Sequence, residues 1–262
     1  MKPLSELREP QRIRGLLFDV DDTLTTGGQL TAQAFAAMER LKRADRLVLP
    51  ITGRPAGWCD HIARMWPVDA VVGENGAFYF WHDTEGAKLG KRYMDSDDAR
   101  ASHRAAFDAI TRRILAEVPG CALASDQAYR ENDLAIDYCE DVAPLPLEAA
   151  ERIAALMREA GMSAKISSIH VNGWFGRYDK LATTRLLMQE RFGMELDAEN
   201  SAFAFLGDSP NDSPMFGYFH NSIGVANVSR YAGHLAAAPK YVTRAAAGAG
   251  FAELVARLLG ES

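Results

Sequence analysis

The stretch GLLFDVDDTLT (residues 15–25) joins a run of apolar residues directly to three carboxylates, Asp19, Asp21 and Asp22. The apolar run is typical of a buried β-strand, because a strand that is covered on both faces has no polar face. Three carboxylates at the end of such a strand repel one another and lose hydration, and both effects cost free energy. The stretch therefore predicts that a group of opposite charge binds where the strand ends.

Short apolar runs alternate with amphipathic stretches on both sides of this segment. RLVLPIT (46–52) and DAVVG (69–73) follow it with helical patterns between them, and SAFAFLG (201–207) and SIGVA (222–226) repeat the alternation near the C-terminus. Such a βαβ alternation predicts an α/β fold, with a doubly wound, Rossmann-like core of parallel strands and helices on both faces.

The segment between these two halves has a different pattern. From about residue 83 to 173, two amphipathic helical stretches are combined with strand-like runs in which apolar and polar residues alternate. This pattern favours antiparallel strands that pack against helices on one face. We therefore expect a smaller α+β cap domain at residues 83–173, inserted into a core domain that consists of residues 1–82 and 174–262.

The composition excludes several classes of protein. The 262-residue chain is 48% hydrophobic and has 29 Lys and Arg against 35 Asp and Glu, for a net charge of −6. Nucleic acid is not an expected partner because there is no basic patch, and a membrane is not expected because no run approaches about 18 apolar residues. The charged start lacks the apolar run of a signal peptide, and the three cysteines form no disulfide or zinc pattern. We expect a cytoplasmic protein.

Polar residues also follow two further predicted strands of the core. Thr52 and Gly53 follow the second strand, and GDSPND (207–212) follows a later one. Because the carboxyl ends of parallel strands share one edge of the sheet, we expect these residues to lie beside Asp19 and Asp21. A Mg²⁺ ion would balance such a cluster, since it prefers carboxylate and water oxygens and leaves room for a substrate phosphate. Helix capping or turn formation is the alternative explanation for the Asp and Thr residues.

The order of these motifs resembles that in phosphatases of the haloacid dehalogenase-like superfamily. That superfamily has DxDxT after the first strand, Thr or Ser after the second, Lys at a helix start and GDxxND after a later strand. The matching residues here are Asp19, Asp21, Thr23, Thr52, Lys180, Asp208, Asn211 and Asp212. The position of the insertion and the stretch ENGA (74–77) resemble subgroup IIB, which contains sugar-phosphate phosphatases. Asp22 stands where Gly is common, and we interpret it as a turn residue that is exposed or capping and does not act as a ligand.

The resemblance implies a role for each motif residue. Asp19 would attack phosphorus to form an aspartyl-phosphate, and Asp21 would act as general acid and then as general base. The implied phosphate-binding residues are Thr52, Gly53, Lys180 and Asn211. The implied Mg²⁺ ligands are Asp19, Asp21 through its backbone carbonyl, Asp208 and Asp212.

The expected partner is a small phosphorylated metabolite such as a sugar phosphate. Its leaving group would contact polar and aromatic side chains of the cap. The candidates are Arg130, His170, Asn172 and Trp174, and a structural role is the alternative for each. A phosphohexomutase-type phosphotransferase would use the same core residues and stays open as a second function. A response-regulator receiver domain also uses an acidic cluster with Thr and Lys, but it is a much shorter chain and does not take its phosphoacceptor from a DxD motif.

Overall fold

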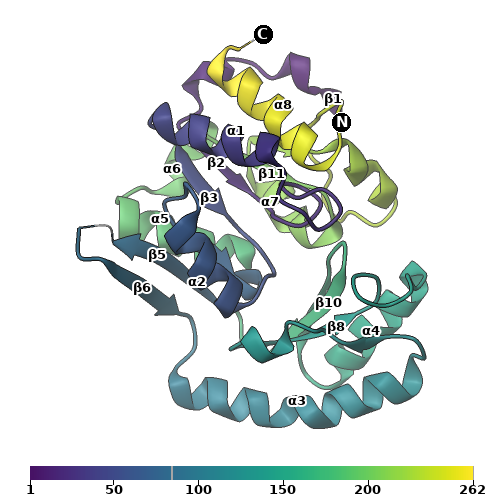
Figure 1. The fold of residues 1–262 in the computed structure, drawn as a ribbon. Coiled ribbons are helices and arrows are strands. Elements are labelled where there is room, and N and C mark those ends of the chain that lie inside the picture. Colours follow the sequence, from purple (N-terminus) through teal and green to yellow (C-terminus); the bar gives the residue numbers. More distant parts are fainter. Residues whose placement is uncertain (84, 262) are drawn as a thin grey trace.

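The computed structural model describes residues 1–83 and 85–261, whose strands form one large parallel sheet and two smaller antiparallel sheets (Figure 1). The strand order in the parallel sheet is β1-β13-β12-β11-β2-β3, which places β2 between β11 and β3. The prediction of a doubly wound α/β core is confirmed. The strands of this sheet are β1 (Lys2–Pro3), β2 (Gly15–Phe18), β3 (Leu47–Pro50), β11 (Phe203–Gly207), β12 (Asn221–Gly224) and β13 (Tyr241–Val242).

Helices cover both faces of the parallel sheet. Leu16 and Phe18 of β2 pack with α1 and α8 on one face, and Leu17 packs with α5 and α7 on the other. All four residues of β2 are buried, which explains why this strand is written as a continuous apolar run. The helices around the sheet are α1 (Ala32–Arg43), α2 (Ala56–Met65), α5 (Lys180–Phe192), α6 (Leu196–Glu199), α7 (Ser213–Tyr218) and α8 (Ala247–Leu259). None of the helices in the described part of the chain has both the length and the apolar character needed to span a lipid bilayer.

A three-stranded antiparallel sheet extends the core beyond β3. It consists of β4 (Val71–Gly73), β5 (Phe78–Asp83) and β6 (Lys88–Tyr93). Strand β4 lies beside the end of β3, because Val72 forms a parallel bridge with Ile51. The predicted start of the cap, residue 83, is the last residue of β5 and therefore lies within the β5–β6 hairpin.

The four-stranded sheet has the order β7-β8-β10-β9, and Figure 1 shows α3 on its side away from the parallel sheet. Leu134, Ile136 and Val171 pack with α3 and α4 in a hydrophobic core of their own. Alternate residues of these strands lie on the opposite face of the sheet. Asn172 and its cross-strand partner Lys165 are on that face. We propose that this unit, from α3 to β10, is the cap. Its elements are α3 (Asp97–Glu117), β7 (Ala122–Leu123), β8 (Asp133–Asp137), α4 (Leu147–Glu159), β9 (Ser163–Ile166) and β10 (His170–Trp174).

Candidate active site

Asp19 lies immediately after β2, where its backbone N–H donates to the carbonyl of Leu206 in β11 at 2.9 Å. Its carboxylate accepts a hydrogen bond from Nζ of Lys180 at 2.7 Å, and the same ammonium group donates to Oδ1 of Asp212 at 2.8 Å. The side chains of Asp19, Lys180 and Asp212 are buried. A single ammonium group therefore connects residues from two distant motifs, although Lys180 stands in a helical first turn, where a lysine usually faces solvent.

The ENGA stretch (74–77) fixes the position of Lys180 through the first turn of α5. Gly76 has a φ of +109°, and a Cβ atom at this residue would lie 2.3 Å from the carbonyl oxygen of Asp179. Only glycine permits this approach without strain. Thr183 donates from its hydroxyl to the Gly76 carbonyl at 2.5 Å, and Asp179 caps the N-terminus of α5.

Three buried carboxylates lie together at this edge of the sheet, from Asp19, Asp208 and Asp212. One oxygen of each lies within 4.8 Å of the other two. Burial raises the pKa of Asp19 to about 8 although Lys180 opposes the shift, and burial with the charges of Asp19 and Asp212 raises the pKa of Asp208 well above its ordinary value. When all three are ionised, one ammonium group leaves two negative charges unbalanced. A divalent cation that prefers oxygen ligands, such as Mg²⁺, fits this donor set.

Asp208 is oriented by two polar side chains. Oγ1 of Thr23 donates to one carboxylate oxygen at 3.4 Å, and Nδ2 of Asn227 donates to the other at 3.3 Å. Asn227 also donates to the backbone carbonyl of Asp22 and accepts the backbone N–H of Ala247. Asn227 was not among the predicted site residues, although it follows β12 and so occupies the same kind of strand-end position as the others.

The predicted phosphate-binding residues surround the same cluster. Gly53 and Asn211 line a cavity together with Asp19. The buried hydroxyl of Thr52 accepts a hydrogen bond from the backbone N–H of Arg54 at 3.0 Å. This bond shapes the loop that carries Gly53. Asn75, which the sequence analysis did not assign to the site, packs its side-chain amide against Gly53. That amide is buried and has no hydrogen-bond partner among residues 1–83 and 85–261.

The cavity at the carboxylate cluster is closed by the cap. Its volume is about 10 Å³, close to the smallest cavity that admits one water molecule. Asp21 lines it from the core, and Arg130, His170 and Asn172 line it from the cap. A phosphoryl group is larger than this space, so we expect the cap and the core to move apart when a substrate enters.

Arg54 connects Asp21 to the cap. Its guanidinium group binds the Asp21 carboxylate through Nε and Nη2 at 2.8–3.0 Å, and Nη2 also donates to Oε1 of Glu140 in the cap at 2.5 Å. The guanidinium lies 4.3 Å from the ring centroid of Trp58. Nε2 of His170 lies 3.0 Å from Glu140. Although burial opposes the shift, contacts with His170 and Arg54 lower the pKa of Glu140 to about 2.

Glu74 forms a second connection between the core and the cap. Its carboxylate accepts the backbone N–H groups of Ala56 in the core and of Glu131, Asn132 and Asp133 in the cap, at 2.6–3.2 Å. Burial and the charge of Asp133 raise its pKa to about 7. Glu74, the first residue of the ENGA stretch, therefore connects the core to the segment 131–133 by hydrogen bonds, as Arg54 connects it to Glu140.

The structure brings three of the four predicted cap residues to the cavity. The guanidinium group of Arg130 donates hydrogen bonds to Asp126 at 2.9 Å, to Asp133 at 3.0 Å and to the Gly53 carbonyl at 2.8 Å. Asn172 donates to Asp133 at 2.9 Å. Protein groups thus accept hydrogen bonds from all three nitrogens of the Arg130 guanidinium, and its position supports the Gly53 loop.

Trp174 lies elsewhere. Its indole N–H donates to the carbonyl of Tyr178 at 3.1 Å, and the two rings stack at 6.0 Å with an angle of 14°. The side chain is buried in a hydrophobic cluster of the core that includes Phe78 and Phe80. Trp174 does not line the catalytic cavity. His170, Asn172 and Trp174 share one face of β10, and this face borders the cavity at its N-terminal end and the hydrophobic cluster at its C-terminal end.

Residues 16–173 match the family model of the haloacid dehalogenase-like hydrolases. The chain belongs to this family. No curated protein sequence matches the chain. Solved structures that share its fold include protein 0175 of Thermoplasma acidophilum, with a TM-score of 0.69 and 16% identity over 94% of this chain and 98% of that chain.

Two other structures with this fold are described as phosphatases. The sucrose-phosphatase of Synechocystis sp. PCC6803, solved with sucrose and phosphate, has a TM-score of 0.61 and 17% identity over 94% of this chain and 98% of that chain. A sugar phosphatase of subclass IIB of the superfamily has a TM-score of 0.60 and 12% identity over 94% of this chain and 99% of that chain. At these identities the comparisons establish the shared fold.

This hydrolase departs from the common form of its first motif at Asp22. Asp22 has a φ of 54°, in the left-handed region that glycine adopts without strain. It lies in the turn after β2, as the sequence analysis expected, and its backbone N–H donates to Oγ1 of Thr25 at 3.2 Å. The side chain is half-buried, and it stands outside the cluster of three carboxylates.

Proposed function

We propose that this hydrolase is a Mg²⁺-dependent phosphomonoesterase that acts on a small phosphorylated metabolite, such as a sugar phosphate, through an aspartyl-phosphate on Asp19. The observation that carries the proposal is the buried cluster in which Lys180 pairs with Asp19 and Asp212 while Asp208 lies alongside. Membership of a hydrolase family supports it. The sugar phosphatases with the same fold support the choice of substrate class.

The charge of the cluster supports the metal. Asp19, Asp208 and Asp212 would hold Mg²⁺ together with the backbone carbonyl of Asp21, as the motif implies. When bound, the ion would neutralise charge on the carboxylates and on the phosphoryl oxygens.

Asp19 would act as the nucleophile. Its carboxylate oxygen forms a bond to phosphorus while the bond from phosphorus to the leaving oxygen breaks, which gives an aspartyl-phosphate. The ammonium group of Lys180 orients the attacking carboxylate before the reaction. During the transfer, the backbone of Gly53 and the amide of Asn211 would bind the phosphoryl oxygens, and Thr52 shapes the loop that carries Gly53.

Asp21 would carry out the proton transfers. It gives a proton to the leaving oxygen in the first step. In the second step it takes a proton from the water that attacks phosphorus, so that phosphate is released and Asp19 is regenerated. The two-point contact with Arg54 holds the Asp21 carboxylate in one direction, and we propose that Arg54 is a positioning residue.

The test is phosphate release from a panel of phosphorylated sugars, sugar acids and disaccharide phosphates, with Mg²⁺ and after its removal by EDTA. We expect release that requires Mg²⁺ and returns when the ion is restored. If the protein instead isomerises the phosphosugar in the presence of a bisphosphate activator, its function is that of a phosphohexomutase. Release that EDTA does not affect, or no reaction with any compound, would overturn the proposal.

A further inference from the structure

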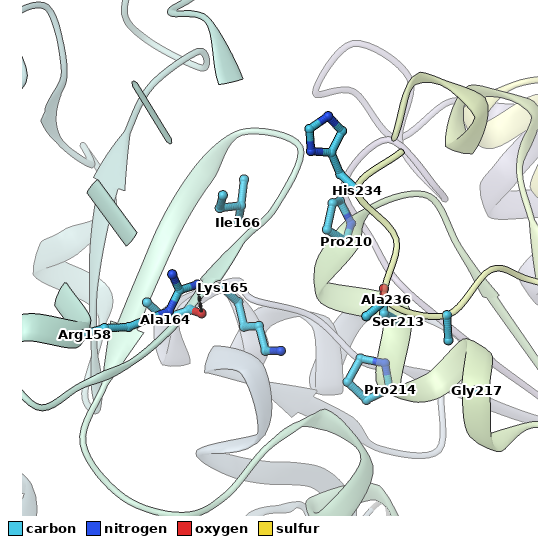
Figure 2. A pocket seen from close by; sticks show the side chains of 11 residues that line it. Arg158, Ala164, Lys165, Ile166, Pro210, Ser213, Pro214, Gly217, His234 and Ala236 are labelled. Carbon is cyan, nitrogen blue, oxygen red and sulfur yellow. Dashed lines mark hydrogen bonds between the residues drawn. The ribbon is translucent and has the colours of Figure 1, made fainter. Parts of the chain in front are cut away.

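A second cavity, of about 490 Å³, lies between the cap and the core beside the catalytic cavity (Figure 2). Its cap wall includes Arg158 at the end of α4 and Lys165 in β9. Its core wall includes Ser213 in α7 and His234. Because the two walls belong to different units, a ligand bound here would contact both of them when the cap is closed.

The register of the cap sheet relates this cavity to the active site. Lys165 in β9 pairs directly with Asn172 in β10, so both side chains project from the same face of the sheet. Asn172 lines the catalytic cavity. On the core side, Pro210 lines the second cavity and its neighbour Asn211 lines the catalytic one. The two cavities therefore adjoin along the surface where the cap meets the core.

The second cavity carries positive charge that protein carboxylates do not balance. Within residues 1–83 and 85–261, neither Lys165 nor Arg158 forms an ion pair, and Arg158 donates to the backbone carbonyl of Ala164 at 3.3 Å. His234 lies 3.6 Å from the carboxylate of Glu151 in α4. Figure 2 shows the Lys165 side chain extending from β9 towards the core wall. Unpaired cations are notable in a chain whose net charge is −6.

The core wall supplies a polar group without a partner. Ser213 is 4% exposed, and its hydroxyl has no hydrogen-bond partner among the described residues. A buried hydroxyl that makes no hydrogen bond is unfavourable, because it has lost its contacts with water. Ser213 lines the cavity, and a rotation of its side chain would present the hydroxyl to an oxygen atom of a ligand bound there.

We infer that the second cavity binds an anionic oxygen group, a carboxylate or a phosphate, between Lys165 of the cap and Ser213 of the core. The inference rests on the proposed function, since it makes this group the second anion of a substrate whose phosphoryl group lies at Asp19. The substrate class is then a phosphorylated sugar acid or a bisphosphate. A separate small anion is the other source of the same chemistry.

Substrate selectivity tests whether the anionic group belongs to the substrate. The probes are glucitol 6-phosphate and 6-phosphogluconate, two open-chain phosphates that differ only in that a carboxylate replaces a hydroxymethyl group. We expect the wild-type protein to prefer the acid, and Lys165→Met to lower the ratio of the two kcat/KM values about tenfold, as for the loss of one charge-assisted hydrogen bond. Lys88→Met is the matched control, because Lys88 is an exposed lysine of β6 that lines neither cavity, and it should leave the ratio unchanged.

Binding of malonate to the metal-free protein tests the second source and does not depend on turnover. We expect malonate to raise the thermal unfolding midpoint of the wild-type protein and of Lys88→Met, and not that of Lys165→Met. A changed kcat/KM ratio without this stabilisation assigns the anion to the substrate, and stabilisation without a changed ratio assigns it to a separate molecule. If neither depends on Lys165, the inference is wrong. If the wild-type protein releases no phosphate, the proposed function fails. The effect of malonate on the unfolding midpoint still shows whether the second cavity binds an anion.

Discussion

The core and the cap differ in how their buried carboxylates are paired. In the core, the ammonium group of Lys180 bonds Asp19 and Asp212, while Asp208 beside them forms no ion pair among the described residues. In the cap, the guanidinium group of Arg130 bonds both Asp126 and Asp133 directly. A buried carboxylate without a cationic partner is costly unless a ligand completes the site, whereas direct pairing supports a local structure. The unpaired carboxylate of Asp208 therefore distinguishes the core cluster from the cluster around Arg130.

The largest effect is expected at the nucleophile. Asp19→Asn should lower phosphate release by at least about a thousandfold, because the amide cannot attack phosphorus, while circular dichroism shows an unchanged fold. Asp22→Gly is the control from the same turn: it should keep activity, since glycine adopts a φ of 54° without strain. Wild-type turnover by Asp19→Asn would remove Asp19 as the nucleophile.

Removal of the cation in the core cluster should come next. Lys180→Met leaves the carboxylates of Asp19 and Asp212 buried without their shared partner, so we expect a loss of about 3–5 kcal/mol in the free energy of unfolding. The measurement is urea unfolding in metal-free buffer, with Lys88→Met as the control. Saturating Mg²⁺ should restore part of the loss, because it binds the folded state alone. Equal stability of the two variants would contradict the account of the cluster.

A smaller effect is expected at the contact between Arg54 and the cap. Glu140→Gln removes one charge from the closed arrangement but leaves Arg54 bound to Asp21, so kcat/KM should fall about tenfold, mainly through KM, as the closed state becomes less populated. Glu159→Gln, at an exposed ion pair of α4, is the matched control. An unchanged KM in Glu140→Gln would show that this contact does not govern closure.

The same contact has a defined pH dependence. The pKa of Glu140 is lowered from 4.5 to about 2 in the closed protein. Its contribution to closure is therefore complete above about pH 4.5 and is lost as the pH falls from there towards 2. The groups that face it are Arg54 and His170. The stability difference between the wild-type protein and Glu140→Gln, measured by urea unfolding, should be constant at neutral pH and shrink in this acidic window. A difference that persists below pH 2 would contradict the assignment.

The smallest effect on function is expected at Trp174. Trp174→Phe removes the hydrogen bond to Tyr178 and part of the packing, which should cost about 1–2 kcal/mol of stability. The relative kcat/KM values for different sugar phosphates should not change. A change in these ratios, with stability unaffected, would place Trp174 in contact with the leaving group.

The core could be predicted from the sequence because its signals are local. The four residues of β2 are buried on both faces, so the run is apolar throughout, and the position of Asp19 follows from the end of that run. Thr52 and Asp208 follow strands β3 and β11 in the same way. Asn227 follows the same rule and was missed, because one asparagine in a polar loop is not distinguished from its neighbours.

The cap could be predicted only in outline because its signals depend on register and on contacts across the cap–core boundary. His170, Asn172 and Trp174 share one strand face, yet Trp174 lies in a hydrophobic cluster at the end of the strand. The link from Arg54 to Glu140 joins residues 86 positions apart, and no pattern near either residue indicates it. Strand β6 (Lys88–Tyr93) has no buried residue and hence no apolar run, so the hairpin at the expected domain boundary was not predicted.

The most direct measurement asks which residue is phosphorylated during turnover. Asp21→Asn should slow breakdown of the intermediate, so this variant is mixed with substrate and Mg²⁺, quenched within the first turnover and treated with borohydride, which reduces an aspartyl-phosphate to homoserine. The account predicts homoserine at position 19 by mass spectrometry, dependent on both substrate and Mg²⁺. Modification at any other residue, or phosphate release with position 19 never modified, would contradict it.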